Sequence, residues 1–239
     1  MKLYTCYTLS HQVFFDKWFY PTLQDDYDLT AKKFNVMFSG GNYMSNGWYK
    51  AILHKIDLII KAIKDNRDGI FVFSDVDIQF FKKTENAILS CMADNDLITQ
   101  KDADDATGLN TVPGFSGHLC TGFFACRASG RTLRLWEAIR QQSLSRKQHH
   151  DQYWLNHYLN GFQSHRKDNI FGVKWDYLPP EFYSPGIRRG NRGEWSPGDE
   201  LIVPGDIILH HANWTAGVRN KIIQLERVKK IVTERDRYS

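Results

Sequence analysis

Short apolar runs alternate with amphipathic segments along the chain, and this alternation predicts an α/β fold. Residues 2–8 alternate in polarity and are rich in Tyr and Thr, which is typical of a strand, and residues 28–34 form a weaker strand candidate. Residues 46–65 carry isoleucines three and four positions apart, which indicates a helix with one buried face, capped by Asn46. The unbroken apolar run from Ile70 to Phe73 favours a fully buried strand.

Strands and helices interleave through the rest of the sequence. We expect further helices over residues 84–93, 131–146 and 217–236, another helix from Asp151, and strands over residues 96–100, 117–127, 169–178 and 205–211. This order favours a largely parallel sheet covered by helices on both faces. The length of 239 residues suits a single α/β domain over residues 1–239.

Two polar segments, residues 101–116 and 184–199, are predicted to be loops, and the first is expected near the active edge of the sheet. The second contains Arg188, Arg189 and Arg192. It could be a solvated connection or a basic flap that closes over phosphates, because loops often carry function.

Composition and charge limit the kinds of ligand and the location that we expect for this protein. The net charge of +4 suits an anionic ligand such as a nucleotide, and it is too small for a nucleic-acid binding surface. None of the four cysteines forms a Cys-x-x-Cys pair, which argues against a zinc knuckle. The first residues do not form a signal peptide, and no apolar run approaches the ~18 residues of a membrane span. We therefore expect a cytoplasmic protein without a membrane span.

Two aspartates follow the buried strand, at the end where ligands bind in open α/β sheets. Asp75 and Asp77 are two residues apart, so in an extended segment their side chains would point to the same side. Converging carboxylates repel each other unless a cation lies between them, and oxygen ligands suit a hard divalent ion. The alternative is a pair of solvated aspartates in a turn.

The second candidate site follows the last predicted strand. His210 and His211 could complete a metal shell whose other ligands are carboxylates. Gly217 then opens a helix whose free amide groups can receive phosphate, and Lys221 lies one turn further along the same face. A histidine in a strand is more often structural, so this interpretation depends on the neighbouring glycine and lysine.

Together these stretches resemble glycosyltransferases of the GT-A fold, in the nucleotide-diphospho-sugar transferase family that includes plant cell-wall xylosyl- and arabinosyltransferases. The matching segments are Ser74-Asp75-Val76-Asp77, Thr121-Gly122, Asp151-Gln152, Leu178-Pro179-Pro180 and His211-Ala212-Asn213-Trp214 with Gly217 and Lys221. The resemblance implies a Rossmann-like, mixed but mostly parallel central sheet flanked by helices. Cys120 departs from the pattern, because this family often has Asn or Asp before the Thr-Gly step.

The resemblance also implies roles for individual residues. Thr5 and Tyr7 would hold the nucleoside, Asp75, Asp77 and His211 would bind Mn²⁺ or Mg²⁺, and Asp75 could also reach the ribose. His210 is the alternative ligand. Gly217 and Lys221 would bind the diphosphate, Lys55 would pair with the acidic motif or the nucleotide, and Asp151 and Gln152 would lie at the sugar as catalytic residues.

The implied activity is metal-dependent transfer of a hexose or pentose from a nucleotide-sugar, a UDP-sugar, to a glycan or other hydroxyl acceptor, with retention of configuration. A role in polysaccharide biosynthesis would follow. Two alternatives remain: a phosphatase of the haloacid-dehalogenase type, which also places Asp-x-Asp after an apolar strand, and a catalytically inactive module that binds nucleotide or sugar.

Overall fold

A computed structural model describes residues 1–35, 47–102, 118–145, 150–161, 168–185 and 194–237. The position of Asn46, the three arginines of the expected flap and nearly all of the expected loop at 101–116 lie outside these ranges. Among the described residues, no helix is long and apolar enough to cross a membrane. The cytoplasmic location stays a prediction.

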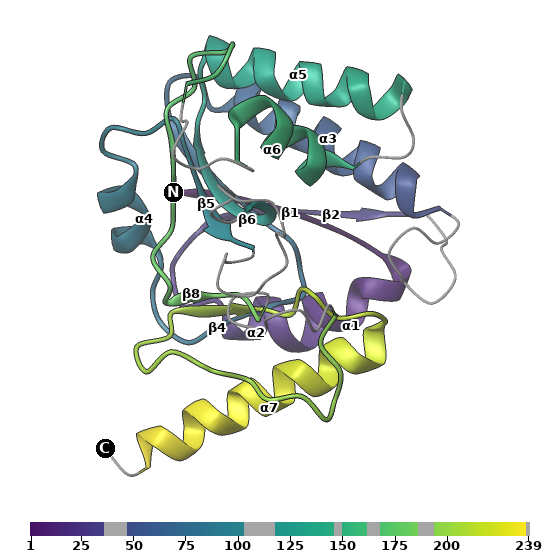
Figure 1. Ribbon diagram of the computed structural model, residues 1–239, viewed down its shortest axis with the longest axis vertical. Helices are drawn as coiled ribbons and strands as arrows, with labels where there is room; N and C mark the ends of the chain where they lie inside the picture. Colours follow the sequence, from purple (N-terminus) through teal and green to yellow (C-terminus); the bar gives the residue numbers. More distant parts are fainter. Residues whose placement is uncertain (36–46, 103–117, 146–149, 162–167, 186–193, 238–239) are drawn as a thin grey trace.

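A six-stranded sheet forms the centre of the molecule (Figure 1). Its order is β2 (Asp28–Phe34), β1 (Lys2–Thr8), β3 (Ile70–Ser74), β6 (Leu119–Arg127), β5 (Leu97–Lys101) and β7 (Trp175–Tyr177). Only β6 runs antiparallel to its neighbours within this sheet, so the mostly parallel α/β fold expected from the sequence is confirmed. The apolar run at Ile70 forms the predicted buried strand, between β1 and β6.

Helices cover both faces of this sheet. On one face lie α3 (Trp48–Asp65), α5 (Gly130–Ser145) and α6 (Asp151–Leu159), which Figure 1 shows together above the strands. Their apolar side chains, such as Ile56 and Trp136, pack against Phe73 and Phe124 of the sheet. Helix α3 buries one apolar stripe that includes these isoleucines, as their spacing in the sequence predicted.

Short helical segments lie on the opposite side of the sheet, and α7 (Val218–Asp236) lies further out on this side (Figure 1). The chain from Leu9 to Thr22 forms η1 (Leu9–His11), α1 (Gln12–Phe14), η2 (Phe15–Phe19) and α2 (Tyr20–Thr22), none of which the sequence analysis predicted. Helix α4 (Glu85–Cys91) follows Thr84 as expected, and its Ile88 is buried on this side.

A second, three-stranded sheet lies between the central sheet and α7, next to the acidic motif (Figure 1). Its order is β4 (Ile78–Phe80), β9 (Leu209–His211) and β8 (Phe182–Tyr183). Strand β4 is antiparallel to β9, and Ile78 lies opposite His211. This pairing places the residue before Ile78 beside the end of β9, although about 130 residues separate them in sequence.

Two strand predictions were too long. Only Trp175–Tyr177 of residues 169–178 is a strand, because the Asn169 side chain accepts the Phe171 and Val173 amides and bends the chain, with Gly172 at φ +64°. Only Leu209–His211 of residues 205–211 is a strand. The Ile208 amide instead donates to the Glu181 carbonyl oxygen, and the Ile208 carbonyl oxygen accepts the amides of Phe81 and Lys82, which follow β4.

Candidate active site

The acidic motif lies in a bend that joins the two sheets. Strand β3 ends at Ser74 and β4 begins at Ile78, so Asp75 and Asp77 are not in one continuous strand. The Asp75 amide donates to the Gly122 carbonyl oxygen at 2.7 Å, and the Asp77 carbonyl oxygen accepts the Ala212 amide at 2.8 Å. These two bonds hold the bend between β6 and the end of β9. The carboxylates do converge, but through this bend rather than through strand alternation.

Asp75, Asp77 and His211 offer ligand atoms that all lie within 4.8 Å of one another. His211 Nε2 is 3.6 Å from Asp77 Oδ1, and both side chains are buried. Two carboxylates and one imidazole are a donor set that suits a divalent first-row ion such as Mn²⁺. The chemistry of these residues therefore fits the metal that the resemblance implied.

The neighbouring histidine faces the other way. His210 is completely buried, with its Nδ1 3.1 Å from Gln79 Nε2 and its Nε2 3.1 Å from Gln224 Oε1. Burial lowers the pKa of His210 to about 3, so the ring is neutral at ordinary pH. Successive side chains of a strand point to opposite faces, and β9 thus directs only His211 to the acidic motif.

Two lysines join this acidic group. Lys221 Nζ, from the first turn of α7, is 2.5 Å from Asp77 Oδ2. Lys55 Nζ, from α3, is 3.0 Å from Asp75 Oδ1 and 3.3 Å from Asp151 Oδ2. Three carboxylates and two ammonium groups leave one net negative charge, which favours a further cation at this place.

The electrostatic effects of burial and pairing differ between the two motif aspartates. Burial alone would raise the pKa of Asp77, but Lys221 and His211 hold it well below its ordinary value. Burial raises the pKa of Asp75, and Lys55 only partly opposes this effect. Burial alone would lower the pKa of Lys55, yet Asp151 and Asp75 raise it. Lys55 is therefore held as a buried cation.

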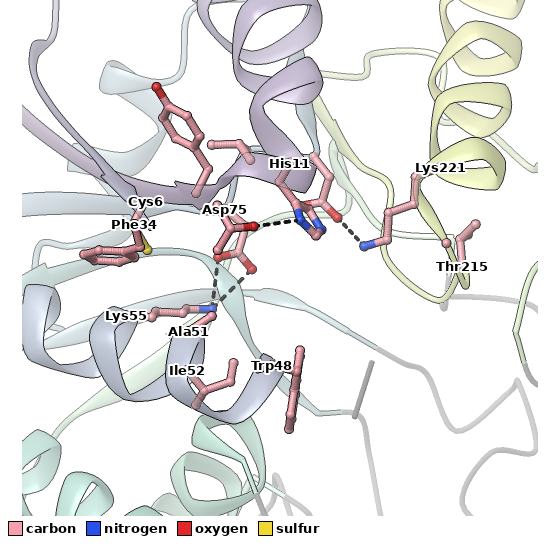
Figure 2. Close-up of a pocket in the computed structure, with 15 residues that line it drawn as sticks. Cys6, His11, Phe34, Trp48, Ala51, Ile52, Lys55, Asp75, Thr215 and Lys221 are labelled. Carbon is pink, nitrogen blue, oxygen red and sulfur yellow. Dashed lines mark hydrogen bonds and ion pairs between the residues drawn. The ribbon is translucent and has the colours of Figure 1, made fainter. Parts of the chain in front are cut away.

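A cavity of about 220 Å³ opens beside the acidic motif. Figure 2 shows Lys55 and Asp75 on one side of it and Lys221 on the other, with His11 between them. Its wall consists of Cys6, Tyr7, Thr8, His11, Phe34, Trp48, Ala51, Ile52, Lys55, Asp75, Val76, Asp77, Thr215, Gly217 and Lys221. Tyr7 is thus at the cavity, whereas Thr5 is completely buried and its neighbours Cys6 to Thr8 form this part of the wall.

The start of α7 contributes to the same cavity. Gly217 precedes the helix at φ 79° and ψ 148°, a conformation that is essentially restricted to glycine. The amides at the start of a 19-residue helix and the Lys221 ammonium together give this wall a positive potential. His11, which the sequence analysis did not find, lies here too, and burial together with Lys221 lowers its pKa to about 4.

The expected sugar-side residues begin α6. Asp151 is buried and reaches Lys55, and the pKa of its carboxyl is held below its ordinary value by Lys55 and His150 despite burial. Gln152 accepts the Thr121 amide at 3.1 Å and donates to Asp102 Oδ2 at 2.8 Å. Neither residue belongs to the described wall of the cavity. Asp151 is connected to the site through Lys55, and Gln152 is connected to it through the backbone of Thr121 in β6.

Asp102 is a second residue that sequence reasoning missed. Its carboxylate also accepts Asn213 Nδ2 at 2.7 Å, and its carbonyl oxygen accepts Trp214 Nε1 at 2.9 Å. It thereby ties the end of β5 to the segment after β9. The sequence analysis placed Asp102 in the polar loop predicted over residues 101–116, where a single aspartate is not distinctive.

Cys120 and Gly122 of β6 both contact the His211 ring. Cys120 Sγ lies 3.7 Å from His211 Nδ1 and accepts the Gly122 amide at 3.3 Å, and burial raises the pKa of its thiol. Cys120, which departs from the family pattern, therefore lies next to the imidazole of the candidate metal site.

Comparisons with known proteins assign this chain a family and a fold. The sequence profile described as nucleotide-diphospho-sugar transferase matches residues 4–225. A comparison with curated proteins gives no match.

Two solved structures share the fold at low sequence identity. A glycosyltransferase involved in the glycosylation of the major capsid of PBCV-1 is 9% identical with a TM-score of 0.55, over 95% of this chain and 98% of that one. The galactosyltransferase LgtC, solved with donor and acceptor sugar analogues, is 12% identical with a TM-score of 0.51, over 98% of this chain and 96% of that one. The GT-A fold agrees with the family match, and the chain belongs to the nucleotide-diphospho-sugar transferase family.

Proposed function

We propose that this chain transfers a hexose or pentose from a UDP-sugar to a hydroxyl group of a glycan or glycoconjugate, and that residues 1–239 act as one catalytic domain. The observation that carries the proposal is the convergence of Asp75, Asp77 and His211 with two lysines at the edge of a cavity. LgtC, whose fold this chain shares, was solved with both donor and acceptor analogues, which supports a two-substrate reaction.

The donor occupies the cavity in this proposal. Tyr7, Phe34 and Trp48 offer aromatic and apolar surface for the nucleoside, and Lys221 with the first amides of α7 binds the diphosphate. Lys221 contacts Asp77 in the structure, so a phosphate oxygen would compete for the same ammonium.

Asp75, Asp77 and His211 would hold Mn²⁺ or Mg²⁺, which supplies Lewis-acid stabilisation of the leaving diphosphate when bound. Lys221 adds a preorganised positive charge where the negative charge develops. Removal of one such donor typically lowers the rate by ~10²–10³.

The sugar lies toward Lys55 and Asp151 in this proposal, and the configuration at its anomeric carbon is retained. Asp151 is buried and paired with Lys55, an arrangement that favours electrostatic support over direct attack on the sugar. Gln152 holds the backbone of Thr121 on β6 and so shapes the same side.

A thermal-shift panel tests the donor site. Nucleoside diphosphates and nucleotide-sugars are compared with and without Mn²⁺ on the wild type, on Asp77→Ala and on Asp28→Ala, an exposed aspartate at the amino end of β2. A ligand at ~100 times its dissociation constant adds about 2.7 kcal/mol. We expect manganese-dependent stabilisation by a uridine nucleotide in the wild type and Asp28→Ala but not in Asp77→Ala. No shift with any nucleotide would contradict the proposal.

The same proteins separate an enzyme from an inactive binding module. Donor hydrolysis or transfer in the presence of Mn²⁺ supports the enzyme, and tight nucleotide binding without either reaction supports the module. The family match removes the phosphatase alternative.

A further inference from the structure

Gln100 of β5 is completely buried behind His211, and its amide orientation is fixed by the backbone. Gln100 Nε2 donates to the carbonyl oxygens of Phe182 at 3.0 Å and Tyr183 at 2.8 Å. Carbonyl oxygens only accept hydrogen bonds, so the NH₂ group must face them. The remaining amide atom, Oε1, then faces His211 Nδ1 at 3.0 Å.

This orientation selects one tautomer of His211. An amide oxygen cannot donate, so a hydrogen bond at 3.0 Å requires the hydrogen on His211 Nδ1. Cys120 Sγ, at 3.7 Å from the same nitrogen, is a weaker partner than Gln100 Oε1. Nε2 of the neutral ring then carries a lone pair, and this is the atom 3.6 Å from Asp77 Oδ1.

The adjacent histidine is held in the opposite tautomer. Gln79 Nε2 donates to the Leu225 carbonyl oxygen at 2.9 Å, so its NH₂ group also faces His210 Nδ1, which must accept. His210 Nε2 then donates to Gln224 Oε1 at 3.1 Å.

Gln224 is itself oriented by a further bond. Its Nε2 donates to Thr215 Oγ1, whose hydroxyl hydrogen is given to the Asn213 carbonyl oxygen. Both nitrogens of His210 are therefore used inside the protein, whereas His211 keeps one nitrogen for a ligand.

We propose that Gln100 is a positioning residue that fixes His211 with its hydrogen on Nδ1 and so makes Nε2 the metal-binding atom. The proposal rests on the proposed metal site, and it adds the reason why only one of two adjacent histidines can serve there. A partner that orients a metal-bound histidine typically changes metal affinity by about 10- to 100-fold.

NMR of the metal-free protein tests the tautomers without any activity measurement. Histidine nitrogens are labelled isotopically and observed at a pH above the ordinary histidine pKa of about 6.5. The signals are assigned through His210→Ala and His211→Ala. We expect a hydrogen on Nδ1 of His211 and on Nε2 of His210. A hydrogen on Nε2 of His211, with Nδ1 bare, would overturn the proposal whatever the wild type does with Mn²⁺.

Calorimetric titration with Mn²⁺ tests the consequence for binding. Gln100→Met keeps the size and removes both hydrogen-bonding groups, and we expect about 10- to 100-fold weaker binding and a mixture of His211 tautomers. Gln100→Glu restores an acceptor for Nδ1 but not the donor to the two carbonyls. We expect it to recover the tautomer and the binding that Gln100→Met loses.

Gln79→Met is the matched control, because it removes similar bonds from the other histidine. It should leave the His211 signals and Mn²⁺ affinity unchanged. Wild-type affinity in Gln100→Met, or an equal loss in Gln79→Met, would contradict the positioning role. A wild type that does not bind Mn²⁺ would instead contradict the proposed function, while the NMR result still tests Gln100.

Discussion

The imidazole of His211 fills the space that a β-carbon on Gly122 would need. A β-carbon built at Gly122 lies 2.2 Å from His211 Cε1 and 2.9 Å from Nε2, far inside normal contact. The His211 ring can therefore occupy its position only because residue 122 is a glycine, although the two residues are 89 positions apart in sequence.

Gly122→Ala should displace the His211 ring and weaken Mn²⁺ binding by about 10- to 100-fold. Titration calorimetry measures the change. Gly198→Ala is the control, since nothing lies within 4 Å of a β-carbon there. Equal Mn²⁺ affinity in the two variants would mean that His211 can move without cost or does not bind the metal.

Lys55→Met should destabilise the fold, because it leaves Asp75 and Asp151 without their shared ammonium. Breaking a buried ion pair by removing one partner costs about 3–5 kcal/mol, which urea unfolding can measure. Asp151→Asn in the same chain should recover part of the loss. Lys64→Met is the control, because its exposed pair with Glu137 is worth at most about 1 kcal/mol. A loss that small in Lys55→Met would show that the carboxylates are not held as charges.

The sequence predicted the parts of the fold that depend on local periodicity. The isoleucine stripe of α3 and the apolar run of β3 are properties of neighbouring residues, so both could be found. The bend at Asp75–Asp77 and the pairing of Ile78 with His211 depend on a contact between distant segments. Strands β4 and β8 have only three and two residues, too few for a periodic signal.

The candidate site shows the same division. The sequence predicted Asp75, Asp77, His211 and Lys221 as site residues because motif and chemistry coincide, and the structure brings these side chains together. Gln100, Asp102 and His11 could not be found, because their positions acquire meaning only from partners far along the chain.

The two adjacent histidines should respond differently to removal. His210→Ala leaves one N–H of the Gln79 amide and the Oε1 of Gln224 without their partner in the core, so it should lower stability by about 1–3 kcal/mol for each with little change in Mn²⁺ affinity. His211→Ala should mainly lower Mn²⁺ affinity. Thermal unfolding and titration calorimetry on both variants separate these effects. The reverse order of affinity losses would assign the ligand to His210.

Stability should fall as pH decreases from about 6.5 to about 4. The pKa of His210 is lowered to about 3 and that of His11 to about 4, so the unfolded chain binds more protons than the folded protein in this window. Each such proton contributes a slope of at most about 1.4 kcal/mol per pH unit. Asp75, whose pKa is raised, acts in the opposite direction. His210→Asn should flatten the profile from urea unfolding, and an unchanged slope would show that His210 does not titrate on unfolding.

Asp151→Asn should spare nucleotide affinity and lower the rate of transfer. The substitution keeps the size of the side chain and removes a buried negative charge 3.3 Å from Lys55, on the side where we propose that the sugar lies and becomes cationic during transfer. A tenfold rate loss corresponds to about 1.4 kcal/mol of transition-state stabilisation, and we expect at least that loss for Asp151→Asn.

Asp96→Asn is the matched control, because Asp96 is also a buried aspartate in an ion pair, but its partner is Arg131 and not Lys55. Both variants can lose thermal stability, but only Asp151→Asn should lose transfer at saturating donor. If the two behave alike, the carboxylate of Asp151 serves the fold rather than the reaction.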